Sequence, residues 1–88
     1  MNETTTKILN PGELYEIHMI VTGPLMMLGV YYNMEEQSEF VAWSDSYSAN
    51  RRGLIYAVAE LTKNIIEKNG SWHIGAVYAL AETVERWG

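Results

Sequence analysis

Cysteine is absent from this chain of 88 residues, so the chain can form no disulfide and offers no thiol for catalysis or metal binding. The absence suits a reducing compartment. No stretch approaches the roughly 20 apolar residues that span a bilayer. Residues 1–7 also lack the basic start and apolar run of a signal peptide. We therefore expect a soluble cytoplasmic protein with no membrane association.

Positive charge is scarce in the chain. Six Lys and Arg side chains stand against eleven Asp and Glu side chains, which gives a net charge of −5 at pH 7. Residues 1–45 contain seven of the acids and a single basic residue, Lys7, whereas residues 46–88 contain four acids and five basic residues. A negative field repels nucleic-acid phosphate and anionic lipid and favours a basic partner surface. The alternative is that the acidity serves solubility alone.

Motifs of catalysis and ligand binding are also missing. There is no glycine-rich phosphate loop and no Gly-x-Ser-x-Gly nucleophile elbow. His18 and His73 have no neighbouring ligands at a spacing typical of metal sites, so we interpret them as structural or surface histidines. Glu35 and Glu36 are predicted to lie in a solvated loop, which does not raise a carboxyl pKa as general acid catalysis requires. We expect no enzymatic activity, no metal and no cofactor, and no motif assigns the chain to a family.

The uncharged stretch Leu25–Tyr32 is apolar on both of its faces, which is typical of a strand covered on both sides. Apolar residues alternate over residues 15–21 before it and over residues 38–43 after it. In the last of these segments the alternation places Phe40 and Trp43 on opposite faces. The short connections favour antiparallel pairing. The pattern predicts a three-stranded antiparallel β-meander with Leu25–Tyr32 at its centre.

Two helices are predicted to follow the strands. Apolar residues of the first helix recur at the helical period, at Leu54, Val58, Leu61 and Ile65. Gly53 in its first turn indicates either close packing or a late helix start, and residues 68–70 (Lys-Asn-Gly) are typical of a helix C-terminus. A second helix is predicted from about Ile74 to Trp87, although the alternation over residues 72–75 is also compatible with a short strand.

The predicted fold class is α+β, with the β-meander followed by two α-helices packed on one face of the sheet. Residues 1–10 are polar and show no periodicity, so they are predicted to be a flexible tail ahead of a single domain at residues 11–88. Two helices cover one face only. We expect the helices to cover the face of the central strand that carries Leu25 and Tyr31 and to leave the opposite face exposed, although the sequence also allows the alternate assignment.

That exposed face and the acidic loop beside it form the predicted partner-binding surface. Its residues are Met26, Leu28, Val30, Tyr32, Glu35, Glu36, Glu39, Val41 and Trp43. Met and aromatic residues are enriched at protein interfaces, and an apolar patch of this kind marks association. The sequence therefore predicts a small acidic protein-interaction module that binds a protein partner or forms a homodimer. An inhibitor of a nucleic-acid-binding partner, of the type that phages encode, fits the description.

The segment from Asp45 to Arg52 carries the densest group of polar side chains. Ser48, Arg51 and Arg52 beside a helix N-terminus could bind an anion, because free backbone N–H groups and the helix dipole both favour negative charge. The plainer interpretation is that Asp45 or Ser48 caps the helix while the arginines are solvated. A nucleic-acid or anion-binding domain is the alternative function, and a small enzyme with its site in this segment is a third.

Overall fold

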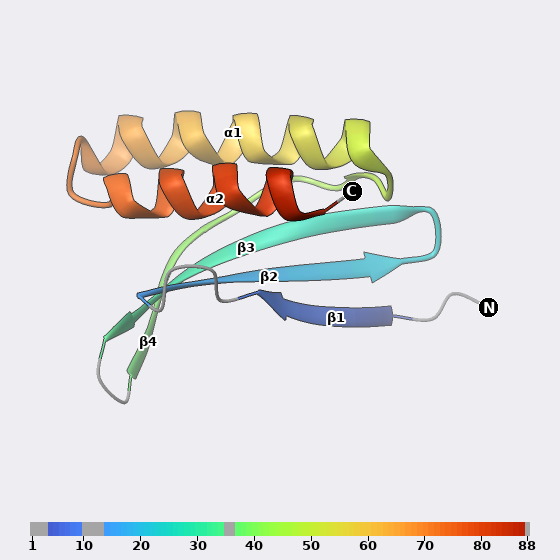
Figure 1. Ribbon diagram of the computed structural model, residues 1–88, viewed down its shortest axis with the longest axis horizontal. Helices are drawn as coiled ribbons and strands as arrows, with labels where there is room; N and C mark the ends of the chain where they lie inside the picture. The colour runs from blue at the N-terminus through green and yellow to red at the C-terminus, as the bar shows by residue number, and fades with distance from the viewer. Residues whose placement is uncertain (1–3, 10–13, 35–36, 88) are drawn as a thin grey trace.

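The computed structural model describes residues 4–9, 14–34 and 37–87. It is an α+β fold in which two helices lie on one side of an antiparallel sheet (Figure 1), as the sequence predicts. The strands, in chain order, are β1 (Thr4–Leu9), β2 (Tyr15–Thr22), β3 (Leu25–Met34), β4 (Gln37–Trp43) and β5 (Tyr47–Ser48). The helices are α1 (Arg51–Asn69) and α2 (Ile74–Arg86).

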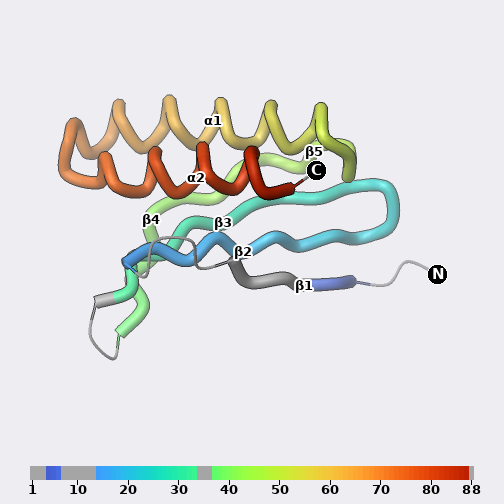
Figure 2. The backbone as a smooth tube through the Cα atoms, viewed as in Figure 1, coloured from blue at the N-terminus to red at the C-terminus, as the bar shows by residue number. Residues whose placement is uncertain are grey.

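The sheet is built around β3, in agreement with the predicted central strand. The spatial order is β1-β2-β3-β4, and every pairing is antiparallel. β5 also pairs with β3, at Leu25 and Met26, beyond the end of β4 (Figure 2). Between β4 and β5, the Ser44 N–H donates to the Leu28 carbonyl at 2.8 Å and the Leu28 N–H donates to the Ser44 hydroxyl at 2.9 Å. Ser44 therefore continues the hydrogen bonding along β3.

The prediction of three strands was too low, because it assigned residues 1–10 to a tail and did not include the two-residue strand β5. Thr4–Leu9 instead forms β1, an edge strand that pairs with β2 from Thr4↔Thr22 to Leu9↔Ile17. Threonine is a good strand former, but three consecutive threonines show no apolar–polar alternation. Hydrophobic periodicity therefore does not predict an edge strand whose side chains are mostly polar.

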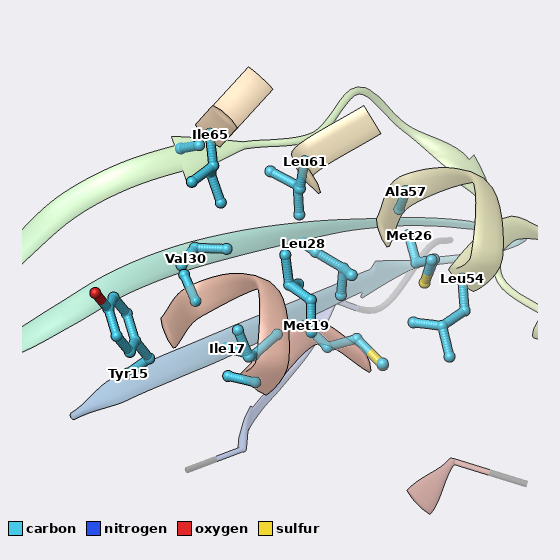
Figure 3. Packing of buried hydrophobic residues seen from close by; sticks show 14 residues of the cluster. Tyr15, Ile17, Met19, Met26, Leu28, Val30, Leu54, Ala57, Leu61 and Ile65 are labelled. Carbon is cyan, nitrogen blue, oxygen red and sulfur yellow. The ribbon is translucent and has the colours of Figure 1, made fainter. Parts of the chain in front are cut away.

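The hydrophobic core lies between the sheet and the helices (Figure 3). The sheet contributes alternate residues of β2 and β3, namely Tyr15, Ile17, Met19, Met26, Leu28 and Val30. The helices contribute one apolar stripe each, namely Leu54, Ala57, Leu61 and Ile65 from α1 and Ala76, Ala79 and Leu80 from α2. The predicted stripe of the first helix is thus confirmed as core-facing at Leu54, Leu61 and Ile65, with Val58 packed at the margin of the core.

The start of α1 explains the glycine in its first turn. Asn50 is the N-cap, and its side chain accepts a hydrogen bond of 2.9 Å from the Gly53 N–H, so the expectation that Asp45 or Ser48 caps the helix was wrong. A Cβ at Gly53 would lie 1.7 Å from the Ser48 carbonyl oxygen. Close packing against β5, one of the two predicted explanations, is therefore the reason for Gly53.

The connection between the helices is short. Gly70 ends α1 with φ 58°, a left-handed conformation that glycine adopts at little cost, and its N–H donates to the Ile66 carbonyl. Residues 71–73 form a turn, and α2 begins at Ile74. The predicted start of the second helix is confirmed, and a strand over residues 72–75 is not formed.

Candidate functional site

One face of the sheet has no helix over it (Figure 1), and we call it the open face. Side chains alternate across a strand, so the neighbours of the core residues point away from the helices. On β2 and β3 the open-face residues are Glu16, His18, Ile20, Leu25, Met27, Gly29 and Tyr31. Leu25 is 47% exposed, whereas the neighbouring core residues are buried. Most of the other open-face residues are half-buried, so this face remains in part accessible to solvent.

The predicted choice of exposed face was wrong. Met26, Leu28 and Val30 are at most 1% exposed and lie in the core, so they are not available to a partner. β3 is apolar on both faces, and its own sequence cannot tell them apart. The faces are set by β2, because Ile17 lies opposite Val30 and Met19 opposite Leu28 in the hairpin register. The two-residue turn between the strands fixes that register and was the signal that could have corrected the choice.

Four aromatic rings, His18, Tyr31, Phe40 and Trp43, form a cluster on the open face that we call the aromatic platform. His18 stacks on Tyr31 with ring centroids 4.3 Å apart and planes 30° apart. The Trp43 indole Nε1–H donates to the Tyr31 hydroxyl at 3.1 Å, and Phe40 approaches Tyr31 edge-on at 5.9 Å. Tyr31 therefore contacts the three other rings and holds the platform together.

A β-bulge in β4 brings Phe40 and Trp43 to the same face. The register passes from Val30↔Ala42 to Tyr31↔Phe40, so Val41 is an extra residue without a partner on β3. The predicted alternation, which placed Phe40 and Trp43 on opposite faces, was therefore wrong. Val41 packs at the margin of the core, whereas Trp43, a predicted partner-binding residue, lies on the open face.

Gly29 makes room for Trp43 on the platform. A Cβ at Gly29 would lie 2.6 Å from two atoms of the Trp43 six-membered ring, closer than real Cβ contacts. The indole therefore covers the backbone of β3 directly. A glycine inside a strand has this meaning when another group approaches the backbone closely.

The polar residues at the edge of the platform are paired with one another. Glu16 Oε1 lies 3.0 Å from His18 Nε2, and Asn33 Nδ2 donates to Glu16 Oε2 at 3.4 Å. The carboxylate of Glu16 is thus held beside the imidazole that stacks on Tyr31. This contact orients His18 and places an acidic group at the edge of the platform.

Glu39, the acidic residue of the predicted surface that the structure describes, does not join the platform. Glu35 and Glu36 lie outside the described residues. Glu39 is exposed on β4 opposite Tyr32, on the side of the sheet that the helices cover. Tyr32 packs against the margin of the core on that side. The described residues of the predicted partner-binding set therefore lie on two sides of the sheet. Among them, Trp43 lies on the open face.

The predicted anion-binding residues do not all converge, because Arg51 is directed away from Ser48 and Arg52. Arg51 Nη1 donates to the Val84 carbonyl at 3.1 Å and to the Trp87 carbonyl at 2.7 Å, so the guanidinium ties the start of α1 to the C-terminal end of α2. A cation near the last carbonyls of a helix is stabilising. Arg52 and Ser48 line a depression of about 580 Å³ beside Tyr47 and Tyr56. Arg51 thus has a structural role in helix packing.

Chemistry that needs convergent ligands is not indicated by the described part of the chain. Within it, no group of three His, Asp or Glu side chains could hold a metal ion. Neither of its helices is long and apolar enough to cross a membrane. No protein-family model, no curated protein and no solved structure matches this chain. The function must therefore be inferred from the surfaces themselves.

Proposed function

We propose that this chain is a non-enzymatic protein-interaction module that binds a protein partner through the aromatic platform. The observation that carries the proposal is that the four rings are ordered by mutual contacts while Phe40 remains 56% exposed. Tyr and Trp supply large contact areas with few rotatable bonds, so ordering them on binding costs little entropy. An apolar area of this kind on one face of a sheet usually marks association.

The charge of the chain favours a basic partner. A net charge of −5 accelerates encounter with a positively charged surface and disfavours direct binding of nucleic acid. The partner that fits both the platform and the charge is a nucleic-acid-binding protein. This chain would block its basic surface, in the manner of a phage-encoded inhibitor. We place this activity in the cytoplasm, where a chain without cysteine needs no disulfide. A second copy of the chain is the competing occupant of the platform.

Capture from a native lysate with matched variants tests the proposal. Phe40→Glu puts a charge on the platform, and Tyr78→Glu puts the same charge on α2, where Tyr78 is 72% exposed. We expect a protein that is retained by the unmodified chain and by Tyr78→Glu and is lost with Phe40→Glu. Equal retention by both variants would contradict binding through the platform.

Light scattering over a range of concentrations separates the two occupants. A mass that doubles with concentration, and that Phe40→Glu restores to the monomer, assigns the platform to a second copy. A monomeric mass at every concentration excludes self-association and favours a different protein as the partner of the platform. Both variants must unfold at the same temperature as the unmodified chain for the comparison to hold.

The alternative function, an anion- or nucleic-acid-binding domain, is not favoured by a specific contact. Both hydrogen bonds of Arg51 go to carbonyl groups of the chain, which removes one of the two arginines on which that hypothesis relied. Arg52 is exposed, but a lone exposed arginine is ordinary on a protein surface.

A further inference from the structure

A second concave surface lies on the side of the sheet that the helices cover. Five residues line a depression of about 340 Å³ there: Tyr15, Tyr32, Glu39, Trp72 and His73. They come from β2, β3, β4 and the turn between the helices. We call this depression the aromatic pocket. Its volume lies within the range of small-ligand sites, which starts at roughly 300 Å³.

The rings of the pocket are inclined to one another. Tyr15 and Tyr32 have centroids 5.1 Å apart with planes at 43°, and Tyr32 and His73 are 5.5 Å apart at 59°. Trp72 meets His73 at 6.5 Å and 80°. Because the rings do not stack in parallel, they present their faces and edges in different directions.

The floor of the pocket is fixed by a buried hydrogen bond. The Tyr15 hydroxyl lies 2.8 Å from His73 Nδ1, and both residues are less than 8% exposed. Gly75 leaves space for the Tyr15 ring, because a Cβ at Gly75 would lie 2.9 Å from it. Burial, followed by the nearby Tyr32, raises the pKa of Tyr15 above 10.0, so this phenol stays neutral at physiological pH. The site is therefore formed before any ligand arrives.

The rim of the pocket has two unusual groups. Trp72 is 80% exposed, more than any other large hydrophobic side chain that the structure describes. Glu39 supplies a carboxylate, and the five lining residues include no Lys or Arg. An anionic ligand would face this carboxylate and the negative faces of the rings, so the lining disfavours it. A cation is attracted by both.

We propose that the aromatic pocket binds an organic cation, an alkylated ammonium group, against the rings of Tyr32 and Trp72 and over the floor formed by Tyr15 and His73, with Glu39 as its counter-ion. Aromatic faces attract an ammonium whose methyl groups also make apolar contacts, and such a group loses little hydration on entry. Trp72, exposed in the free chain, becomes covered when the cation enters. The cation is either a free small molecule or the modified side chain of a peptide. The pocket lies across the sheet from the aromatic platform and does not depend on the function proposed for it.

The test is a titration of the full chain followed by nuclear magnetic resonance of the Trp72 indole and the His73 ring. The ligands are tetramethylammonium, choline, a trimethyl-lysine peptide and 3,3-dimethylbutanol, the neutral carbon analogue of choline, at constant ionic strength. We expect the cations to give saturable chemical-shift changes. The neutral analogue should bind with an affinity at least about tenfold lower. Tighter binding of the peptide than of choline identifies a protein side chain as the source, and the reverse identifies a free molecule.

Two surface substitutions with matched controls complete the test. Glu39→Gln and Trp72→Ala each should weaken the binding of tetramethylammonium by about three- to thirtyfold. Glu67→Gln and Tyr78→Ala, which change the same kinds of exposed residue on α1 and α2, should leave it unchanged. The proposal is overturned if no cation gives a saturable shift, or if the neutral analogue binds as well as choline. It is also overturned if Glu39→Gln and Glu67→Gln behave alike in chains that remain folded.

Discussion

The two faces of β3 are both apolar, yet they serve different purposes. On the covered face, Met26, Leu28 and Val30 are aliphatic or flexible side chains at most 1% exposed, packed against α1 and α2. On the open face, Tyr31 is half-buried among aromatic neighbours that are ordered by stacking and by a hydrogen bond. Aliphatic chains gain from complete removal from water, whereas Tyr and Trp tolerate water at their polar ends. The comparison indicates that hydrophobicity alone does not mark a core face.

The largest expected difference between the faces is in the cost of removing a leucine. Leu28→Ala should lower the free energy of unfolding by about 2–5 kcal/mol, because it opens a cavity in a close-packed core. Leu25→Ala removes the same side chain from the same strand, but Leu25 is 47% exposed, so we expect a loss below about 1 kcal/mol. Equilibrium urea denaturation followed by circular dichroism measures both values.

Equal losses for these two leucines would mean that the open face is packed as tightly as the covered one. A milder pair is available if Leu28→Ala leaves too little folded protein. Ile17→Val on the covered face should cost about 0.5–1.5 kcal/mol, and Ile20→Val on the open face should cost less.

The next expected effect concerns the contact between Gly29 and Trp43. Gly29→Ala places a methyl group 2.6 Å from the indole ring, so the ring must move, at a cost of about 1–3 kcal/mol. In a chain that already carries Trp43→Ala, the same substitution meets no ring and should cost little or even stabilise the strand by about 0.5–1 kcal/mol. Urea denaturation of the four chains gives the coupling energy. Additive effects would show that Trp43 does not rest on Gly29.

The elements of the fold could be predicted from the sequence because their signals are local. Alternation identified β2, and an uncharged run that is apolar on both faces identified β3 as the centre of the sheet. The 3.6-residue period identified α1 and α2, with the end of α1 near Gly70 and the start of α2 near Ile74. β1 was not predicted because its three consecutive threonines show no alternation of apolar and polar residues. The choice of face failed because it depended on pairing between β2 and β3, which is a tertiary property of two segments together.

The candidate sites were less predictable for a related reason. The platform depends on one unpaired residue, Val41, and a single-residue bulge leaves no mark in a pattern of seven residues. The aromatic pocket joins Tyr15 to His73, which are 58 positions apart, and no spacing rule connects them. Tyr32 and Glu39 were both singled out by the sequence, but as members of an exposed face rather than as neighbours in a pocket.

A smaller effect is expected from the hydrogen bond that holds the platform together. Tyr31→Phe removes the hydroxyl that accepts from the Trp43 indole but keeps the ring that stacks on His18. We expect a loss of about 0.5–1.5 kcal/mol in the free energy of unfolding, and a shift of the Trp43 fluorescence towards that of a hydrated indole. A chain with unchanged stability and unchanged fluorescence would mean that stacking alone orders the platform.

The polar contacts differ between the faces as well, and this difference gives the smallest expected effect. On the open face they stay within the sheet, whereas on the covered side the Tyr47 hydroxyl donates to Glu60 Oε1 at 2.6 Å and so joins β5 to α1. The hydrogen bond to Glu60, with smaller contributions from burial and the nearby carboxylates, raises the pKa of Tyr47 from 10.0 to about 12. The folded chain therefore keeps this proton at a pH where the unfolded chain has lost it.

The sign of the resulting pH dependence follows from the number of bound protons. Between pH 10 and 12 the unfolded chain binds fewer protons at this residue, so stability is fully present below pH 10 and falls as the pH rises towards 12. Tyr47→Phe should be less stable below pH 10 and should lose less stability across that interval, measured by urea denaturation at its two ends. A slope remains in the variant, because the pKa of Tyr15 is also raised. Identical slopes in the two chains would show that the bond between β5 and α1 contributes nothing to the cohesion of the covered side.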